Sequence, residues 1–339
     1  MRPRRFLLSR TDRLGDLILS TPVATALKQN FPQAEVHFLA RPKVAEILRI
    51  HPHVDGVIEY EAGNSASNLA AQLCAYKCDV VLALFPRPQL AWTFYRAGIP
   101  VRIGTGFRWY SPLFTHRVFE HRKDARRHEA EYNLQLLRPL GLTPGPVEFH
   151  YHFSPLQDEQ IRSKLAACGI PERFVVLHPG SGGSARDWPL ESFAALAHYL
   201  DAECRLQVVL TGSSNEKPLA QFIRQRAQAK PIDLAGRLTL IELAALLRHA
   251  ALFVSNSTGP LHLAVMMQTP VMAFYPPITA CRPERWGPYG RHGDVMMSRT
   301  EECFDCRRTR ERTCQCMRDI AVAAAIRKAE EKLSTCRVT

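Results

Sequence analysis

Residues 174–189 read FVVLHPGSGGSARDWP and give the clearest indication of the fold class. The apolar run Phe174–Leu177 has the length of a buried strand, and the Gly/Ser-rich loop after it leads to Pro189, which suits the first turn of a helix. Apolar residues at 3.6-residue spacing then predict a helix over 190–200. A strand, a glycine-rich loop and a helix in this order predict a βαβ unit of a parallel sheet.

The same alternation extends in both directions. Strands are expected at 6–8, 36–39, 56–58 and 80–84 in the first half, and at 206–210, 232–234, 252–254 and 271–274 in the second. Helices are expected at 17–30, 44–49, 66–76, 126–137, 216–228, 239–249 and 258–267, and Thr239 with Glu242 has the spacing of a capping box. We therefore predict an α/β protein with two Rossmann-like domains, whose parallel sheets face a central cleft.

Length and composition agree with two domains. The chain has 339 residues, of which 46% are hydrophobic and 22% charged, and this predicts a globular fold. Gly and Pro are dense over 140–146, so the boundary is expected between about Gly141 and Pro155, with domains at 1–148 and 149–318.

Charge and hydropathy limit the partners and the location. The formal net charge is +12, and eight Lys or Arg lie between Arg96 and Arg127 against two acids, so a polyanion is expected to bind the N-terminal half. No apolar run approaches the ~20 residues of a membrane span. We expect a cytoplasmic protein, with electrostatic attachment to the inner face of the membrane as an open alternative.

The loop after the first strand carries a candidate catalytic carboxylate. Gly15 allows a tight turn, and Asp16 would stand where it can take a proton from an attacking hydroxyl. The alternative is that Asp16 caps a helix. Pro22 fits either a new helix capped by Thr21 or a kink in one begun at Asp16.

Two loops of the second half suit a diphosphate. The loop over 178–189 offers backbone N–H groups and hydroxyls at Ser181 and Gly182, with the charge of Arg186 beside them, although an ordinary flexible loop is the alternative. Residues 255–262 place small side chains at a helix start, where N–H groups attract anions. The candidate donor-binding residues there are Ser257, Thr258, Gly259, Pro260 and His262. His262 is equally compatible with a place in the core.

Two further features leave alternatives open. Glu216 either accepts hydrogen bonds from ligand hydroxyls or caps its own helix. The pairs Cys303-x2-Cys306 and Cys314-x-Cys316 resemble a zinc site, but free thiols are the default for a protein expected in the cytosol.

Taken together, these motifs resemble glycosyltransferase family 9, which contains the ADP-heptose:lipopolysaccharide heptosyltransferases. The similarity runs in order from about residue 5 to 320. Its motifs are Gly15-Asp16, the loop from His178 to Pro189, residues 233–243, residues 255–262 and the stretch from Pro283 to Pro288.

The resemblance implies a GT-B fold, with an acceptor domain, a nucleotide-sugar domain and a last helix over 319–339 that returns to the first domain. It also implies inversion of configuration with no metal ion and no cofactor, Asp16 as the base, and Arg186 beside the donor phosphates. Arg10 and Arg13 are expected to contact an anionic glycolipid acceptor. Family members usually carry Asp at the position of Ser257. The expectation that the donor is ADP-heptose therefore depends on the other motifs.

Three rival functions were weighed. An NAD-dependent enzyme is disfavoured because no GxGxxG follows the first strand. A nucleic-acid-binding protein is disfavoured because no recognisable module is present, so no nucleic-acid partner is expected. A catalytically degenerate binding protein, or a transferase for another nucleotide sugar, remains compatible with Ser257.

Overall fold

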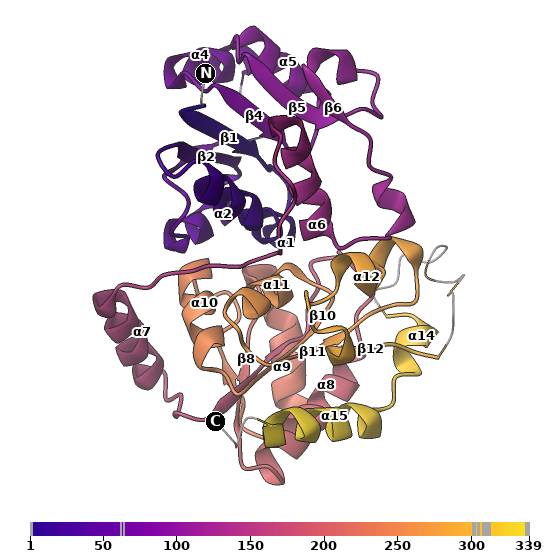
Figure 1. The fold of residues 1–339 in the computed structure, drawn as a ribbon. Coiled ribbons are helices and arrows are strands. Elements are labelled where there is room, and N and C mark those ends of the chain that lie inside the picture. Colours follow the sequence, from indigo (N-terminus) through magenta and orange to yellow (C-terminus); the bar gives the residue numbers. More distant parts are fainter. Residues whose placement is uncertain are drawn as a thin grey trace. The chain divides into compact units, whose positions relative to one another are not determined.

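The structure is a computed structural model that describes residues 3–61, 63, 65–299, 303, 306 and 313–335. The chain forms two compact units, Met1–His152 and Phe153–Thr339, and each contains one six-stranded parallel sheet (Figure 1). This confirms the predicted class of two Rossmann-like domains. The units divide after His152, which lies within the predicted range from about Gly141 to Pro155.

The first unit is doubly wound, with strand order β3-β2-β1-β4-β5-β6. Its strands are β1 (Arg5–Ser9), β2 (Glu35–Ala40), β3 (Gly56–Glu59), β4 (Val80–Ala83), β5 (Val101–Thr105) and β6 (His116–Val118). Its helices are α1 (Leu14–Ile18), α2 (Thr21–Asn30), α3 (Pro42–Ala45), α4 (Ala66–Tyr76), α5 (Pro88–Arg96) and α6 (Glu129–Leu134). Because the order reverses between β1 and β4, the loops after these two strands flank the point where such sheets bind ligands.

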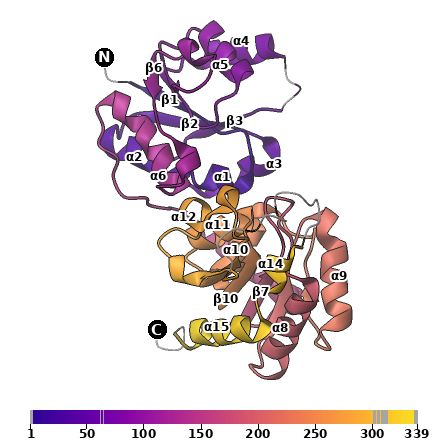
Figure 2. The ribbon, with the colours of Figure 1, turned by 90° about the vertical axis from the view of Figure 1, so that its right-hand side faces the viewer.

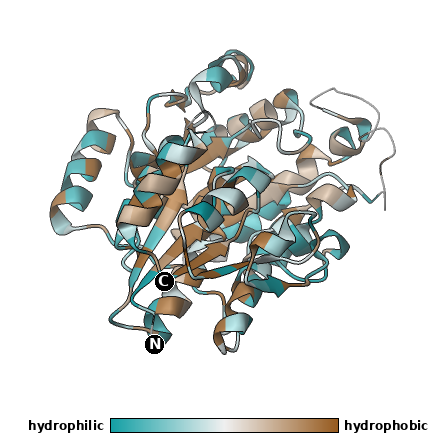
Figure 3. Cartoon of the chain, turned by 90° about the horizontal axis from the view of Figure 1, so that it is seen from above, coloured by the Kyte–Doolittle hydropathy of each residue, from teal (hydrophilic) through white to brown (hydrophobic). Residues whose placement is uncertain are grey.

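Helices cover both faces of this sheet. On one face α4 and α5 bring Leu73 and Phe94 against Leu7 and Val81 of the strands. On the other face α2 packs against α6. The central strands β1 and β4 are buried and hydrophobic over almost their whole length, as the middle of a sheet covered on both faces requires (Figure 3).

The second unit repeats the topology, with strand order β12-β11-β10-β7-β8-β9. Its strands are β7 (Phe174–His178), β8 (Gln207–Leu210), β9 (Ile232–Asp233), β10 (Leu252–Asn256), β11 (Val271–Phe274) and β12 (Val295–Met296). Its helices are α7 (Pro155–Ala167), α8 (Leu190–Ala202), α9 (Lys217–Arg226), α10 (Leu240–His249), α11 (Gly259–Met266), α12 (Pro283–Trp286), α14 (Gln315–Arg318) and α15 (Val322–Thr335). Here the order reverses between β7 and β10, so the loops that follow these strands are the corresponding ligand-binding position.

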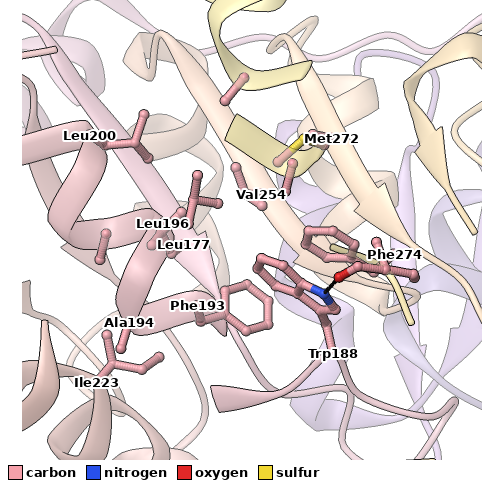
Figure 4. Close-up of a cluster of buried hydrophobic side chains, with 14 of the residues drawn as sticks. Leu177, Trp188, Phe193, Ala194, Leu196, Leu200, Ile223, Val254, Met272 and Phe274 are labelled. Atoms are coloured by element: carbon pink, nitrogen blue, oxygen red, sulfur yellow. Dashed lines mark hydrogen bonds between the residues drawn. The ribbon is translucent and has the colours of Figure 1, made fainter. Parts of the chain in front are cut away.

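Trp188 anchors the core of the second unit. Its ring is fully buried and stacks on Phe274 with the centroids 4.1 Å apart, while Phe193 packs edge-on (Figure 4). The indole N–H donates to the carbonyl of Ile320 at 2.9 Å. This bond attaches the segment before α15 to the loop after β7, and α15 itself lies along α8 (Figure 2). The predicted contact of this last helix with the first domain stays a prediction.

The structure corrects several predicted elements. The helix expected over 17–30 is two helices, because α1 ends at Ile18 and α2 begins at Thr21 with Ser20, not Thr21, as its N-cap. The polar helix expected over 126–137 begins only at Glu129, and this residue and Asn133 are buried. The helix expected over 44–49 is a short α-helix followed by a 3-10 turn. Four further elements, α5, β5, β6 and α7, were not predicted from the sequence.

Candidate functional site

Asp16 lies in α1, directly after the loop that follows β1. The N-cap of α1 is Arg13, and Asp16 is the third residue of the helix, so the interpretation of Asp16 as a cap is wrong. One of its carboxylate oxygens accepts a hydrogen bond from Nη2 of Arg10 at 2.6 Å. The Asp16 side chain is 18% exposed, which leaves it accessible to a ligand.

Arg10 is the buried centre of this part of the first unit. Its side chain is 3% exposed, and its guanidinium contacts the carboxylates of Asp12 at 2.8 Å, Asp16 at 2.6 Å and Glu129 at 3.3 Å. Burial lowers the pKa of Arg10, but these three carboxylates together raise it above its usual value. Burial also raises the pKa of Asp12 to about 6, against the opposing effect of Arg10. A buried cation with several carboxylate partners holds each partner in a defined position.

The network belongs to the switch point of the first sheet. The backbone N–H of Phe85 donates to the carbonyl of Ser9 at 3.2 Å, which joins the chain beyond β4 to the end of β1. Arg10 also donates to the carbonyl of Leu84 at 3.2 Å. The candidate base therefore stands where doubly wound sheets place their ligands.

The sequence analysis missed the partners that α6 supplies. Glu129 is 2% exposed and pairs with Arg122 at 2.5 Å as well as with Arg10. Asn133 receives a weak contact from Arg10 at 3.4 Å and donates to the carbonyl of Leu19 at 3.0 Å, just where α1 and α2 separate. No local pattern distinguishes these residues from the exposed polar residues of a surface helix.

The two arginines expected to contact the acceptor differ in their surroundings. Arg13 is exposed at the start of α1 and is accessible to a large anionic ligand. Arg10 is enclosed by carboxylates, so its guanidinium is paired with Asp16 within the protein and is not exposed to an acceptor.

In the second unit, the loop after β7 has a backbone shape that glycine permits. Gly182 and Gly183 have φ of 57° and 76°, where other residues are strained. Gly180 packs so closely on Glu216 that a Cβ would lie 1.9 Å from the carboxylate. Glu216 accepts from the N–H of Gly182 at 3.1 Å and forms a capping box with Ser213. These contacts place Glu216 as a support of the loop; its predicted ligand contact stays a prediction.

Glu216 holds this loop as a carboxylate. Its pKa lies below the usual value although burial opposes this, because Ser213, His178 and the N–H of Gly182 stabilise the charged form. His178 is itself buried, donates or accepts at 3.0 Å with Thr211, and has its pKa lowered by burial. The Glu216 carboxylate and the buried imidazole of His178 thus both support this loop.

Hydrogen bonds join this loop to the start of α11. The side-chain amide of Asn256 donates to the carbonyl of Pro179 at 2.6 Å and accepts from the N–H of Trp188 at 2.8 Å. The hydroxyl of Ser184 donates to the carbonyl of Ser257 at 2.9 Å. Since β7 and β10 are adjacent strands, both candidate donor loops lie at one edge of the sheet, as predicted from the order of elements.

The remaining candidate residues fall in or next to these two loops. Ser181 is buried and its hydroxyl donates to the carbonyl of Ala185, whereas Arg186 is half-buried and donates to the carbonyl of Cys306 at 2.7 Å. Thr258 is the N-cap of α11, its side chain makes no capping bond, and Pro260 lies in the first turn. His262 is 6% exposed. Gly259 begins the helix.

The profile of glycosyltransferase family 9 (heptosyltransferase) matches residues 66–316, well over half of the chain. The chain belongs to glycosyltransferase family 9. It is therefore a glycosyltransferase.

This family 9 protein is similar to lipopolysaccharide heptosyltransferase 3 of Escherichia coli K12, with 29% identity over 280 residues, 77% of this chain and 79% of the relative. It also resembles a glycosyl transferase family 9 structure from Veillonella parvula (TM-score 0.84, 23% identity), with 98% of this chain and 97% of that one covered. A third match is E. coli ADP-heptose LPS heptosyltransferase II (TM-score 0.80, 22% identity), over 99% of this chain and 100% of that one. These structural matches confirm the GT-B fold.

The family match bears unevenly on the candidate residues of the glycosyltransferase. Arg186, Glu216 and the 255–262 loop lie within the matched residues, whereas Arg10 and Asp16 precede them. The roles of all these residues remain predictions, and those of Arg10 and Asp16 rest on the geometry of the first unit.

Proposed function

We propose that this glycosyltransferase moves a heptosyl group from ADP-heptose to a sugar of a lipopolysaccharide core, with inversion at the anomeric carbon and without a catalytic metal ion. The observation that carries the proposal is that each unit has polar loops at its own switch point, the position where doubly wound sheets bind ligands. The choice of a heptosyl group, a lipopolysaccharide acceptor and ADP-heptose follows the names of the similar E. coli proteins.

The second unit is proposed to hold the donor diphosphate. The N-terminus of α11 presents the backbone N–H of Gly259 and the positive end of the helix dipole, both of which stabilise a diphosphate. Arg186 adds a charge-assisted donor from the neighbouring loop. Because the leaving group is ADP, these groups also stabilise the charge that develops as the glycosidic bond breaks.

The first unit is proposed to hold the acceptor and the base. Asp16 accepts the proton of the acceptor hydroxyl. At the same time the acceptor oxygen bonds to the anomeric carbon, and the bond between that carbon and the ADP oxygen breaks. Arg10 orients the Asp16 carboxylate through the 2.6 Å contact and is a positioning residue rather than an acceptor contact. Arg13, which is exposed, is the arginine proposed to meet phosphate on the glycolipid.

Donor titration by calorimetry tests the nucleotide site. ADP-heptose, and the GDP-, UDP- and dTDP-sugars, are titrated into the protein in buffer without added divalent cations. We expect selective binding of ADP-heptose, weakened about 10- to 100-fold by Arg186→Ala because a charge-assisted hydrogen bond is lost. The control is Arg224→Ala, which removes an exposed arginine of α9. Equal affinity for all donors, or equal effects of the two variants, would contradict the proposed donor site.

Turnover tests the base. Asp16→Asn should lower kcat by about 10²- to 10⁴-fold and leave the donor Kd nearly unchanged, because general-base catalysis is lost while donor contacts remain. Asp124→Asn, which changes an exposed carboxylate of the same unit, is the control. Full turnover by Asp16→Asn would rule out Asp16 as the base.

We also propose that the first unit binds the inner face of the cytoplasmic membrane. Three aromatic side chains there are strongly exposed, Trp109 at 82%, Phe119 at 62% and Tyr95 at 51%, and Arg108 and Arg117 are exposed near them in sequence. Exposed aromatic and cationic side chains suit an anionic interface. In the described part of the chain, no helix is long and apolar enough to cross a membrane.

Vesicle sedimentation tests this surface. Binding to phosphatidylglycerol vesicles should exceed binding to phosphatidylcholine vesicles and weaken with salt. Trp109→Ala should weaken it further, whereas Leu156→Ala, at an exposed leucine of the other unit, should not. Equal binding to both lipids would refute the electrostatic attachment.

A further inference from the structure

Four cysteines near the end of the second unit come together in space. The Sγ atoms of Cys303, Cys306, Cys314 and Cys316 all lie within 4.8 Å of one another, and all four residues are at most 8% exposed. The Sγ atoms of Cys303 and Cys314 are 3.5 Å apart, and those of Cys306 and Cys316 are 3.4 Å apart. A disulfide requires about 2.05 Å, so these pairs are not disulfides.

The separations are those of a tetrahedral thiolate site. A metal at the centre of four thiolates, with metal–sulfur bonds of about 2.3 Å, places the sulfurs about 3.8 Å from one another. Four sulfur ligands with no oxygen or nitrogen select zinc or iron rather than magnesium or calcium. We propose that these four cysteines bind one thiophilic metal ion, Zn²⁺ or Fe²⁺.

The site is closed and therefore structural. All four ligands come from the protein, which leaves no open position for a substrate, and the thiols belong to the same buried cluster as Trp188 and Met317. The ion is separate from the proposed sugar-transfer chemistry, which uses no metal. A protein that binds no metal would therefore overturn this proposal and leave the donor and base assignments standing. Failure of the donor or base assignment would likewise leave the metal proposal standing.

The ion would also support the donor loop. Arg186 donates to the carbonyl of Cys306 at 2.7 Å, and the N–H of Cys303 donates to the carbonyl of Pro277 at 3.1 Å. Trp188, two residues after Arg186, donates to Ile320, four residues after Cys316. The proposed metal centre thus fixes the backbone that holds Arg186 in place.

Elemental analysis of the full-length protein, purified without chelator and freed of any affinity tag, is the primary test. We expect about one equivalent of zinc or iron per chain, and the metal found identifies the ion. A mercurial reagent should release it as four thiols react. Protein that has no bound metal, and that takes up neither Zn²⁺ nor Co²⁺ under reducing conditions, would overturn the proposal. So would two disulfides found by mass spectrometry in the untreated protein.

Variants locate the ion. Cys303→Ser and Cys316→Ser should each lose most of the metal, whereas Cys78→Ser, at a buried cysteine of the first unit, should keep it. Arg186→Ala should also keep it, because Arg186 donates to the backbone carbonyl of Cys306 and not to its thiol. If the cysteine variants do not fold, the cobalt-substituted wild-type protein decides: strong sulfur-to-cobalt charge-transfer absorption supports thiolate ligands, and its absence overturns them.

Discussion

Replacing Arg10 with glutamine should destabilise the first unit strongly. The change removes the cation shared by Asp12, Asp16 and Glu129, together with the bond to the carbonyl of Leu84. Removing one partner of a buried ion pair costs about 3–5 kcal/mol, because the remaining charge is left uncompensated.

The lower end of that range applies here. Glu129 retains Arg122 at 2.5 Å, and water can reach the Asp12 and Asp16 side chains, which are 13% and 18% exposed. We therefore expect a loss of about 3 kcal/mol. For a unit the size of Met1–His152, this corresponds to a fall in Tm of roughly 6–12 °C.

Scanning calorimetry of the full-length protein measures this loss. Arg13→Gln is the matched control: it makes the same change of charge in the same loop, at an exposed side chain, and should alter stability by less than about 0.5 kcal/mol. A double variant with Asp16→Asn should lose less than the sum of the two single variants, because the 2.6 Å contact can be lost only once. If Arg10→Gln and Arg13→Gln lower the Tm equally, the buried network is not stabilising.

Three further predictions concern other contacts. Trp188→Phe leaves the buried carbonyl of Ile320 without its donor and should lower the unfolding free energy of the second unit by about 2 kcal/mol in urea; an unchanged midpoint would contradict this. Burial, with His53 and His150 nearby, lowers the pKa of His51 to about 3. The contribution of His51 to the unfolding free energy is therefore fully present above pH 6.5 and is lost as the pH falls toward 3. His51→Gln should make the unfolding free energy decline less steeply over this range, and parallel curves of unfolding free energy against pH for the variant and the wild type would refute this. Glu216→Gln weakens the acceptor of the Gly182 N–H and should lower ADP affinity several-fold by calorimetry. An unchanged affinity would show that the charge of Glu216 does not support the donor loop.

What the sequence predicts well is set by neighbours along the chain. The strand, loop and helix over 174–200 were predicted because burial, glycine content and 3.6-residue spacing are all local signals. The capping box of Thr239 and Glu242 is likewise present as predicted. The break between α1 and α2 was ambiguous, because Pro22 is compatible with both a new helix and a kink.

What the sequence could not predict depends on pairing at a distance. Arg10 was expected to contact an acceptor, but Glu129, 119 positions away, helps to enclose its guanidinium. The same limit applies to the cysteines: spacing alone left free thiols as the default, and only the folded chain brings the four Sγ atoms within 4.8 Å. The sequence left Glu216 open between a cap and a ligand contact, and only the folded chain shows how closely Gly180 approaches its carboxylate.

The two candidate sites occupy the same topological position in their respective units, and the roles proposed for them are complementary. In each unit the loop after the first strand borders the reversal of strand order, so Asp16 follows β1 and Arg186 follows β7. The first of these loops is stiffened by a buried cation, and the second by glycines and a carboxylate. A displacement at an anomeric carbon needs a base on one side and a stabilised leaving group on the other. In the proposed mechanism, Asp16 of the first unit meets the first requirement and Arg186 of the second unit meets the second, and both residues follow the first strand of the same topology.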